Sequence, residues 1–105
     1  MKSIYRGRAK ISGGLLNQVV GSGTVSWNAG TVANGTVTST TKAVTDAALG
    51  DTVVVGVPID LLGCTFSGYV SAAGTVTVAV ANNSGASQTL GTAASNWKIQ
   101  VQRIA

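Results

Sequence analysis

The chain contains no histidine and no glutamate, and its 105 residues include one cysteine and one proline. Without histidine, a Ser-His-Asp or Cys-His nucleophilic system cannot form. The single cysteine, Cys64, can supply neither an internal disulfide nor the ligands of a zinc site. No P-loop or dinucleotide-binding glycine motif is present. We therefore expect a protein that is not an enzyme and that holds no cofactor or metal.

Long apolar runs are also missing. No stretch approaches the 18 apolar residues of a membrane-spanning helix, so we expect no membrane partner. The charged beginning of the chain is not followed by the apolar segment of a secretory signal. These features, with the lone cysteine, predict folding in a reducing cytoplasm.

Charge is scarce, at 10% of residues, and unevenly placed. Residues 1–10 carry four basic side chains and no acid, whereas the rest of the chain carries three basic and three acidic side chains. The sequence thus predicts a neutral body with a basic N-terminal arm. Such an arm suits an acidic protein surface or nucleic acid, although it could also only solubilise the body.

Large apolar residues are interleaved with the basic residues of the arm. We predict that residues 1–12 are an extended attachment arm whose contact residues are Lys2, Ile4, Tyr5, Arg6, Arg8, Lys10 and Ile11. Nucleic acid is the less favoured partner, because an RNA-binding module would show several exposed aromatics on a basic face. Glycines at 13, 14, 21 and 23 mark hinges, so we divide the chain into an arm and hinge, 1–23, and a body, 24–105. The apolar residues at 15–20 alternatively form the first core strand.

Valine, threonine, serine and glycine dominate the body, which favours strands and turns. The stretch 51–83 organises it. Val76, Val78 and Val80 alternate with small or polar residues, as expected for a half-buried strand. The preceding segment 71–74 ends in Gly74, which can adopt a positive φ and so predicts a hairpin.

Six clear strands and one or two weaker ones follow at intervals of about 8–12 residues, without a helix. This pattern predicts an all-β fold, a single antiparallel β-sandwich or jelly-roll-like barrel with an extended N-terminal arm. The alternation places the following residues in the core: Val25, Trp27, Val53, Val55, Phe66, Val76, Val78, Val80, Trp97, Ile99 and Val101. Cys64 falls on the same strand face as Phe66, and we expect it to be buried and unreactive.

Two further features concern loops. Asp46 and Asp51 flank the turn at 45–50 and are expected to cap backbone N–H groups. The loop at 58–63 carries three large aliphatic residues, Ile59, Leu61 and Leu62. They either tuck into the end of the body or form a second contact patch.

Three segments resemble a β-sandwich module of bacteriophage structural proteins, found in head decoration, head-fibre and tail-associated proteins. They are VTDAALGDTVVVGVP (44–58), FSGYVSAAGTVTVAVANNSGAS (66–87) and NWKIQVQR (96–103). The resemblance covers residues 24–104 and depends on the "ALGD" turn together with the "VSAAGTVTV" hairpin. Residues 1–23 fall outside it, and the short arm in place of a longer preceding chain favours a stand-alone decoration protein over a fibre.

The resemblance implies a capsid decoration, or cement, protein that binds the major capsid protein and stabilises the head. It would assemble in the bacterial cytoplasm and reside on the capsid surface of the virion. Proteins of this kind usually form symmetric oligomers, so a homotrimer is expected, and closed symmetry would also cover open sheet edges. The alternative is a head-fibre or tail-fibre module that binds a host-surface glycan.

Overall fold

The structure is a computed structural model that describes residues 18–104. Within this range the chain forms eight strands and no helix. The strands are β1 (Gln18–Trp27), β2 (Thr31–Val32), β3 (Val37–Ala43), β4 (Thr52–Gly56), β5 (Thr65–Ala72), β6 (Thr75–Ala81), β7 (Gln88–Thr89) and β8 (Ser95–Arg103). The predicted all-β fold is confirmed.

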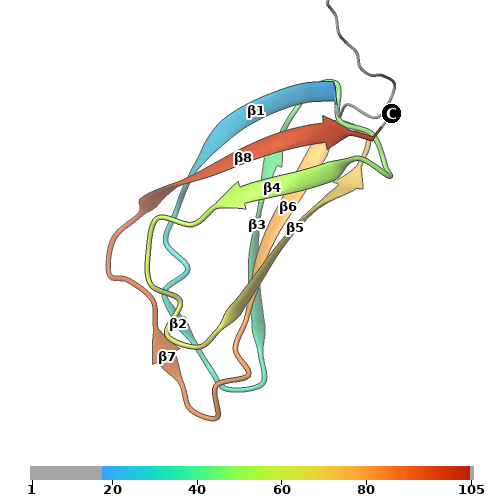
Figure 1. Ribbon diagram of the computed structural model, residues 1–105. Helices are drawn as coiled ribbons and strands as arrows, with labels where there is room; N and C mark the ends of the chain where they lie inside the picture. Colours follow the sequence, from blue (N-terminus) through green and yellow to red (C-terminus); the bar gives the residue numbers. More distant parts are fainter. Residues whose placement is uncertain (1–17, 105) are drawn as a thin grey trace, which may run out of the picture.

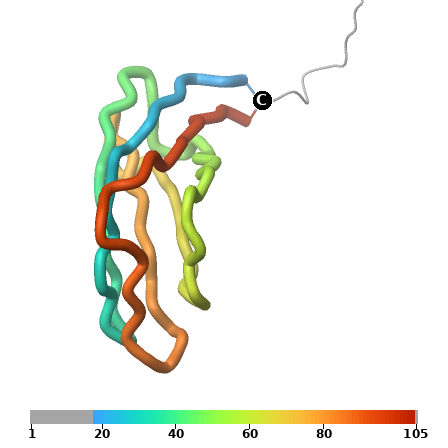
Figure 2. Tube along the Cα trace, turned by 90° about the vertical axis from the view of Figure 1, so that its left-hand side faces the viewer, coloured from blue at the N-terminus to red at the C-terminus, as the bar shows by residue number. Residues whose placement is uncertain are grey.

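Six strands form one antiparallel sheet in the order β1-β8-β4-β5-β6-β3. The sheet curls around its own inner face into a half-barrel (Figure 1). Seen after a quarter turn, β4 stands across from β3 with β6 between them (Figure 2). The two short strands β2 and β7 pair separately at the lower end of the molecule in Figure 1.

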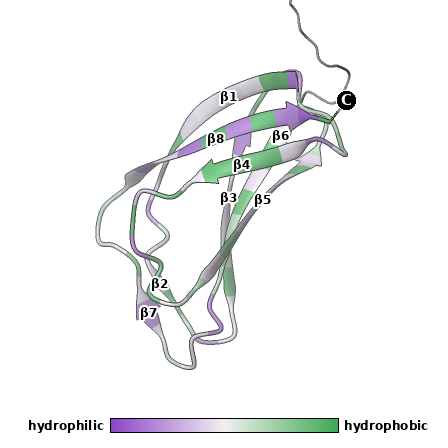
Figure 3. Ribbon diagram, viewed as in Figure 1, coloured by the Kyte–Doolittle hydropathy of each residue, from purple (hydrophilic) through white to green (hydrophobic). Residues whose placement is uncertain are grey.

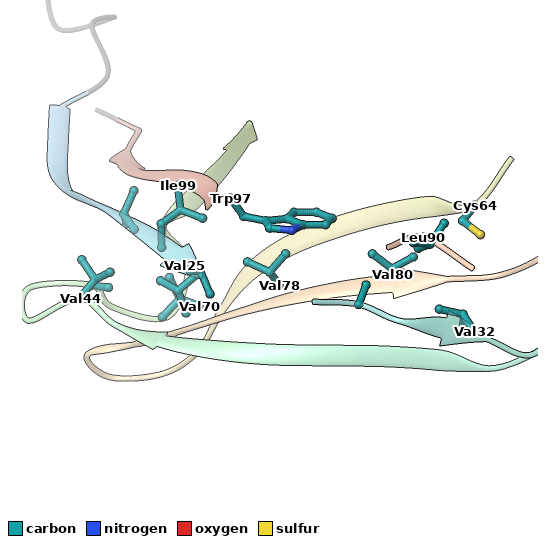
Figure 4. Close-up of a cluster of buried hydrophobic side chains, with 14 residues drawn as sticks. Val25, Val32, Val44, Cys64, Val70, Val78, Val80, Leu90, Trp97 and Ile99 are labelled. Carbon is teal, nitrogen blue, oxygen red and sulfur yellow. The ribbon is translucent and has the colours of Figure 1, made fainter. Parts of the chain in front are cut away.

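The valines of β6 form the floor of the core. Val76, Val78 and Val80 are fully buried, as the alternation predicts. Trp97 of β8 is also fully buried and lies in the middle of the apolar cluster, against Val78 (Figure 4). Its ring centroid is 5.0 Å from that of the partly buried Trp27. Val25, Ile99 and Val101 are buried as predicted, so the inner face of the half-barrel is the single core of the body.

The hairpin between β5 and β6 turns at Ala73-Gly74, where Gly74 has a φ of 75°. This is the conformation that the sequence predicted, and it is one that glycine adopts without steric cost. The register of the hairpin shifts between Val70 and Ala72, which makes Ser71 a bulge residue.

Phe66 is the clear error among the predicted core residues, because 46% of its surface is exposed. Strands β4 and β5 pair only at Thr52 and Tyr69 and then diverge (Figure 1). Phe66 therefore lies on the correct face of β5, opposite Val80, but at the open side of the split between the two strands. Side-chain alternation predicts the face of a residue, and neighbouring strands decide whether that face is covered.

Val53 and Val55 are partly buried against the core, because they close over β5 near the point of divergence. A Cβ added to Gly68 would lie 2.6 Å from Val55 Cγ2 and 2.9 Å from Val53 Cγ1. The absence of a side chain at Gly68 thus lets two valines of β4 cover β5 beside the one position where the two strands pair.

Residues 18–23 are part of β1 and pair with β8. In this segment Val20 packs against the core, whereas Val19 is 56% exposed. Its glycines lie where the sheet edges β1 and β3 approach each other. A Cβ on Gly21 would come within 2.8 Å of Val44 Cγ1, just beyond β3. Gly21 therefore serves close packing between the two edges of the half-barrel.

Candidate functional site

The predicted attachment arm, Lys2, Ile4, Tyr5, Arg6, Arg8, Lys10 and Ile11, lies outside the described residues. The structure does place the point where the chain enters the body. Gln18, the first described residue, pairs with Arg103 at the end of β8. The start of β1 and the end of β8 lie at the upper end of the half-barrel in Figure 1, opposite the β2–β7 ladder.

The loop at 58–63 separates the three aliphatic residues of the predicted second contact patch. Ile59 and Leu61 are partly buried and pack against the core, whereas Leu62 is 45% exposed. The Cys64 amide donates to the Leu61 carbonyl at 2.9 Å, so Leu62 and Gly63 occupy the corners of a tight turn. Only Leu62 is thus presented outward, and the other two hold the loop against the body.

Leu62 adopts an unusual backbone conformation, with a φ of 51°. A left-handed residue other than glycine, asparagine or aspartate costs of order 1–3 kcal/mol. The Asp60 carboxylate accepts a hydrogen bond from the Leu62 amide at 2.9 Å and supports the turn. A leucine at this position is unfavourable for folding, because its backbone is left-handed and its side chain is exposed. Leu62 is therefore a candidate contact residue.

The same end of the molecule is organised by Asn82, which is fully buried. Its Nδ2 donates to the carbonyls of Val32 at 2.7 Å and Ala86 at 2.8 Å. Its Oδ1 accepts from the amide of Ser84 at 2.9 Å and from the Ser84 hydroxyl at 2.7 Å. The sequence predicts a turn here but not this role. The sequence could have indicated it, because Asn82 follows Val76, Val78 and Val80 at the same two-residue spacing and so falls on the inward face of the strand.

Cys64 is 8% exposed, and its predicted burial is confirmed. It lies near Leu90 at the right-hand end of the cluster in Figure 4. Its expected inertness toward thiol reagents stays a prediction.

The electrostatics of the body are dominated by one ion pair. Arg103 Nε donates to Asp51 Oδ1 and Arg103 Nη2 donates to Asp51 Oδ2, each at 2.9 Å. The Ala48 amide also donates to Asp51, which confirms the expected capping role of this aspartate. The hydrogen bond from Arg103, and then that from Ala48, hold the pKa of the Asp51 carboxyl below its usual value. The pair ties the end of β8 to the turn before β4.

A second surface, which the sequence reasoning did not single out, is the outer side of β3, β4, β5 and β6. We call the outward-facing residues of these four strands the neutral face, because they are all Val, Ser, Thr, Ala, Gly or Tyr. Three large residues are exposed on it: Val37 at 65%, Val54 at 49% and Tyr69 at 50%. The signal in the sequence was the absence of charge at every second position of these strands.

Residues 18–104 contain no group of three or more side chains that could hold a metal ion, and no pocket. None of the described residues belongs to a helix long and apolar enough to cross a membrane. No protein-family model, curated protein or solved structure matches the chain. Within residues 18–104 the candidate sites are therefore surfaces, namely the exposed Leu62 and the neutral face.

Proposed function

We propose that the protein is a bacteriophage capsid decoration protein that binds the major capsid protein through its N-terminal arm. The observation that carries this proposal is the separation of charge. Residues 18–104 carry three basic and three acidic side chains, and the buried carboxylate among them is paired with Arg103. Four uncompensated positive charges precede this neutral body.

The arm combines two kinds of contact. Arg6 and Arg8 can pair bidentately with carboxylates of an acidic partner surface, while Ile4 and Tyr5 bury apolar area. A charge pair at the rim of an interface contributes about 0–1 kcal/mol, and a well-buried apolar anchor about 1.5–3 kcal/mol. The apolar residues therefore hold the arm in place, and the charges orient it.

The partner is inferred from the resemblance to phage head modules. The structure of the body is suited to a lasting role in a particle. Its core is continuous, and its loops are closed by internal hydrogen bonds such as those of Asn82. The location follows from the partner: the outer surface of the capsid in the assembled virion.

The test is occupancy on particles that lack the native protein. We expect deletion of residues 1–12 to abolish binding or to weaken it at least a hundredfold, because it removes two or more apolar anchors. Replacing Arg6 and Arg8 with alanine should weaken binding mainly at low salt, since exposed charges are screened as salt rises. Lys98→Ala, which removes an exposed positive charge from β8, is the control and should bind normally.

Full occupancy by the truncated protein would contradict attachment by the arm. It would move the attachment surface to the body, with the loop at Ile59, Leu61 and Leu62 as the next candidate. Binding of the truncated protein that is then lost in Leu62→Ser would identify that loop as the contact.

A further inference from the structure

Asn34 and Gly35 form the one asparagine–glycine pair of the chain. In such a pair the glycine nitrogen can attack the side-chain carbonyl of the asparagine, because glycine has no side chain to hinder the approach. The bond from Gly35 N to Asn34 Cγ forms, the bond from Asn34 Cγ to Nδ2 breaks, and Nδ2 leaves as ammonia with the proton of the Gly35 amide. Water then opens the five-membered succinimide ring at either carbonyl, which gives aspartate or isoaspartate.

The pair lies in the turn that joins β2 to β3, at the lower end of the molecule where β7 has a hydrophilic colour in Figure 3. Both residues are exposed, so water reaches them. The Thr36 amide donates to the Ala33 carbonyl at 3.1 Å, Asn34 has a negative φ and Gly35 has a φ of 81°, which defines a type II turn. Such a turn holds the ψ of its second residue near about +120°, so the backbone must rotate before the Gly35 nitrogen can reach the Asn34 side chain.

Three hydrogen bonds hold this turn against the end of β6 and the loop that follows it. The Gly35 amide donates to the Asn82 carbonyl at 2.8 Å, and the Asn82 amide donates to the Thr36 carbonyl at 3.0 Å. The Gly85 amide donates to Asn34 Oδ1 at 3.1 Å. The attacking nitrogen and the attacked side chain are thus both held by the same distant segment, and the reaction requires their release.

We propose that Asn34 is the site at which this protein deamidates, and that local opening at the lower end of the half-barrel controls the rate. In the closed state the turn and its three hydrogen bonds keep the Gly35 nitrogen away from the Asn34 side chain. The reaction proceeds from the open state, so its rate follows the equilibrium constant of opening. The four hydrogen bonds of the buried Asn82 side chain set that constant, because they join β2 to the loop after β6.

The two products change the lower end in different ways. Each adds one negative charge to residues 18–104, which carry three basic and three acidic side chains. Aspartate keeps an oxygen that can accept from the Gly85 amide. Isoaspartate also lengthens the main chain by one carbon inside the turn, so the hydrogen bonds of Gly35 and Thr36 no longer fit together. We therefore expect the isoaspartate form to be the less stable of the two.

The test is peptide mapping by mass spectrometry of the full-length protein after incubation at mildly alkaline pH, folded and in denaturing urea. In urea, Asn34 should deamidate faster than every other asparagine of the chain. In the folded protein, Asn34 should deamidate at least about tenfold more slowly than in urea, because opening costs free energy. Asn34→Gln is the control for the charge change, and it should abolish the main acidic species that ion-exchange chromatography separates.

Two variants distinguish local opening from global unfolding. Asn82→Ala loosens the lower end and should raise the rate at Asn34 in the folded protein about tenfold. Gly68→Ala, which crowds two valines of β4 away from the turn, is the destabilised control and should leave that rate nearly unchanged. Thermal midpoints show whether each variant is folded. Ser84→Ala removes one hydrogen bond to Asn82 and is the milder variant, which should raise the rate by a smaller factor.

Three results would overturn the proposal: equal rates at Asn34 in the folded protein and in urea, equal acceleration by the variants of Asn82 and Gly68, or faster deamidation of another asparagine in urea. Equal acceleration would show that the reaction proceeds through global unfolding. Because the measurement needs no particles, its outcome does not depend on attachment by the arm.

Discussion

Asn82 shows how much one buried polar side chain decides in this protein. All four of its hydrogen bonds are made inside the fold, to Val32, Ala86 and twice to Ser84. An amide can donate two hydrogen bonds and accept two, so Asn82 is fully satisfied. It joins the end of β6 to the loop after it and to β2, and so closes the lower end of the half-barrel.

We expect Asn82→Ala to lower the free energy of unfolding by about 2–4 kcal/mol, because buried carbonyl and amide groups lose their partners. Asn82→Asp should also destabilise, since its carboxylate would face the carbonyls of Val32 and Ala86. Asn83→Ala, at the exposed neighbouring residue, is the control and should change stability by less than about 0.5 kcal/mol. Chemical denaturation measures all three, and a small effect of Asn82→Ala would contradict the role given to the amide.

At the scale of elements, the split between β4 and β5 sets the shape of the sheet. The two strands share one register pair and then separate, while Val53 and Val55 still reach over Gly68. A strand glycine usually weakens a sheet, and it is kept where another part of the chain must come close. Gly68 is such a position.

Gly68→Ala should destabilise the body by about 1–3 kcal/mol, because its methyl group would overlap both valines of β4. Gly56→Ala is the matched control on β4. A Cβ there would lie 3.5 Å from Lys98 Cβ, an ordinary contact, so we expect a neutral or slightly stabilising effect. Thermal unfolding of the two variants side by side decides between this account and one in which Gly68 is merely tolerated.

The same elements show what the sequence could predict. Period-two alternation placed Val76, Val78, Val80, Trp97 and Ile99 correctly in the core. It failed at Phe66, because the exposure of that residue depends on where β4 leaves β5, and no local pattern encodes that divergence. The neutral face could have been predicted from the uncharged alternate positions. The burial of Ile59 and Leu61 and the exposure of Leu62 could not be predicted from the sequence, because they depend on the geometry of the turn at Leu62 and Gly63.

At the scale of the whole molecule, the Asp51–Arg103 pair joins the end of the chain to the turn before β4. Because the pKa of Asp51 is lowered in the fold, the pair stabilises the protein above the unfolded pKa of the carboxyl, near 3.8. That stabilisation is lost as the pH falls through the lower folded pKa, when the carboxylate becomes protonated.

Arg103→Gln should therefore lower the thermal midpoint at neutral pH, and its difference from wild type should shrink as the pH falls below about 4. Lys98→Gln removes the same charge from the same strand, away from Asp51, and should show no such convergence. Calorimetric scans between neutral and acidic pH give both curves. A deficit of Arg103→Gln that stays constant down to low pH would contradict the role of the ion pair.

The antiparallel pairing of β1 with β8 also determines how the body responds to mechanical force. Their ladder runs from Gln18 opposite Arg103 to Trp27 opposite Ser95. Ladder hydrogen bonds lie perpendicular to the strands. A tension that pulls on Gln18 along the strand axis therefore shears the whole ladder at once, whereas a sideways tension peels its bonds one after another. A body held by the residues before Gln18 would resist being drawn outward along β1 far better than being tilted.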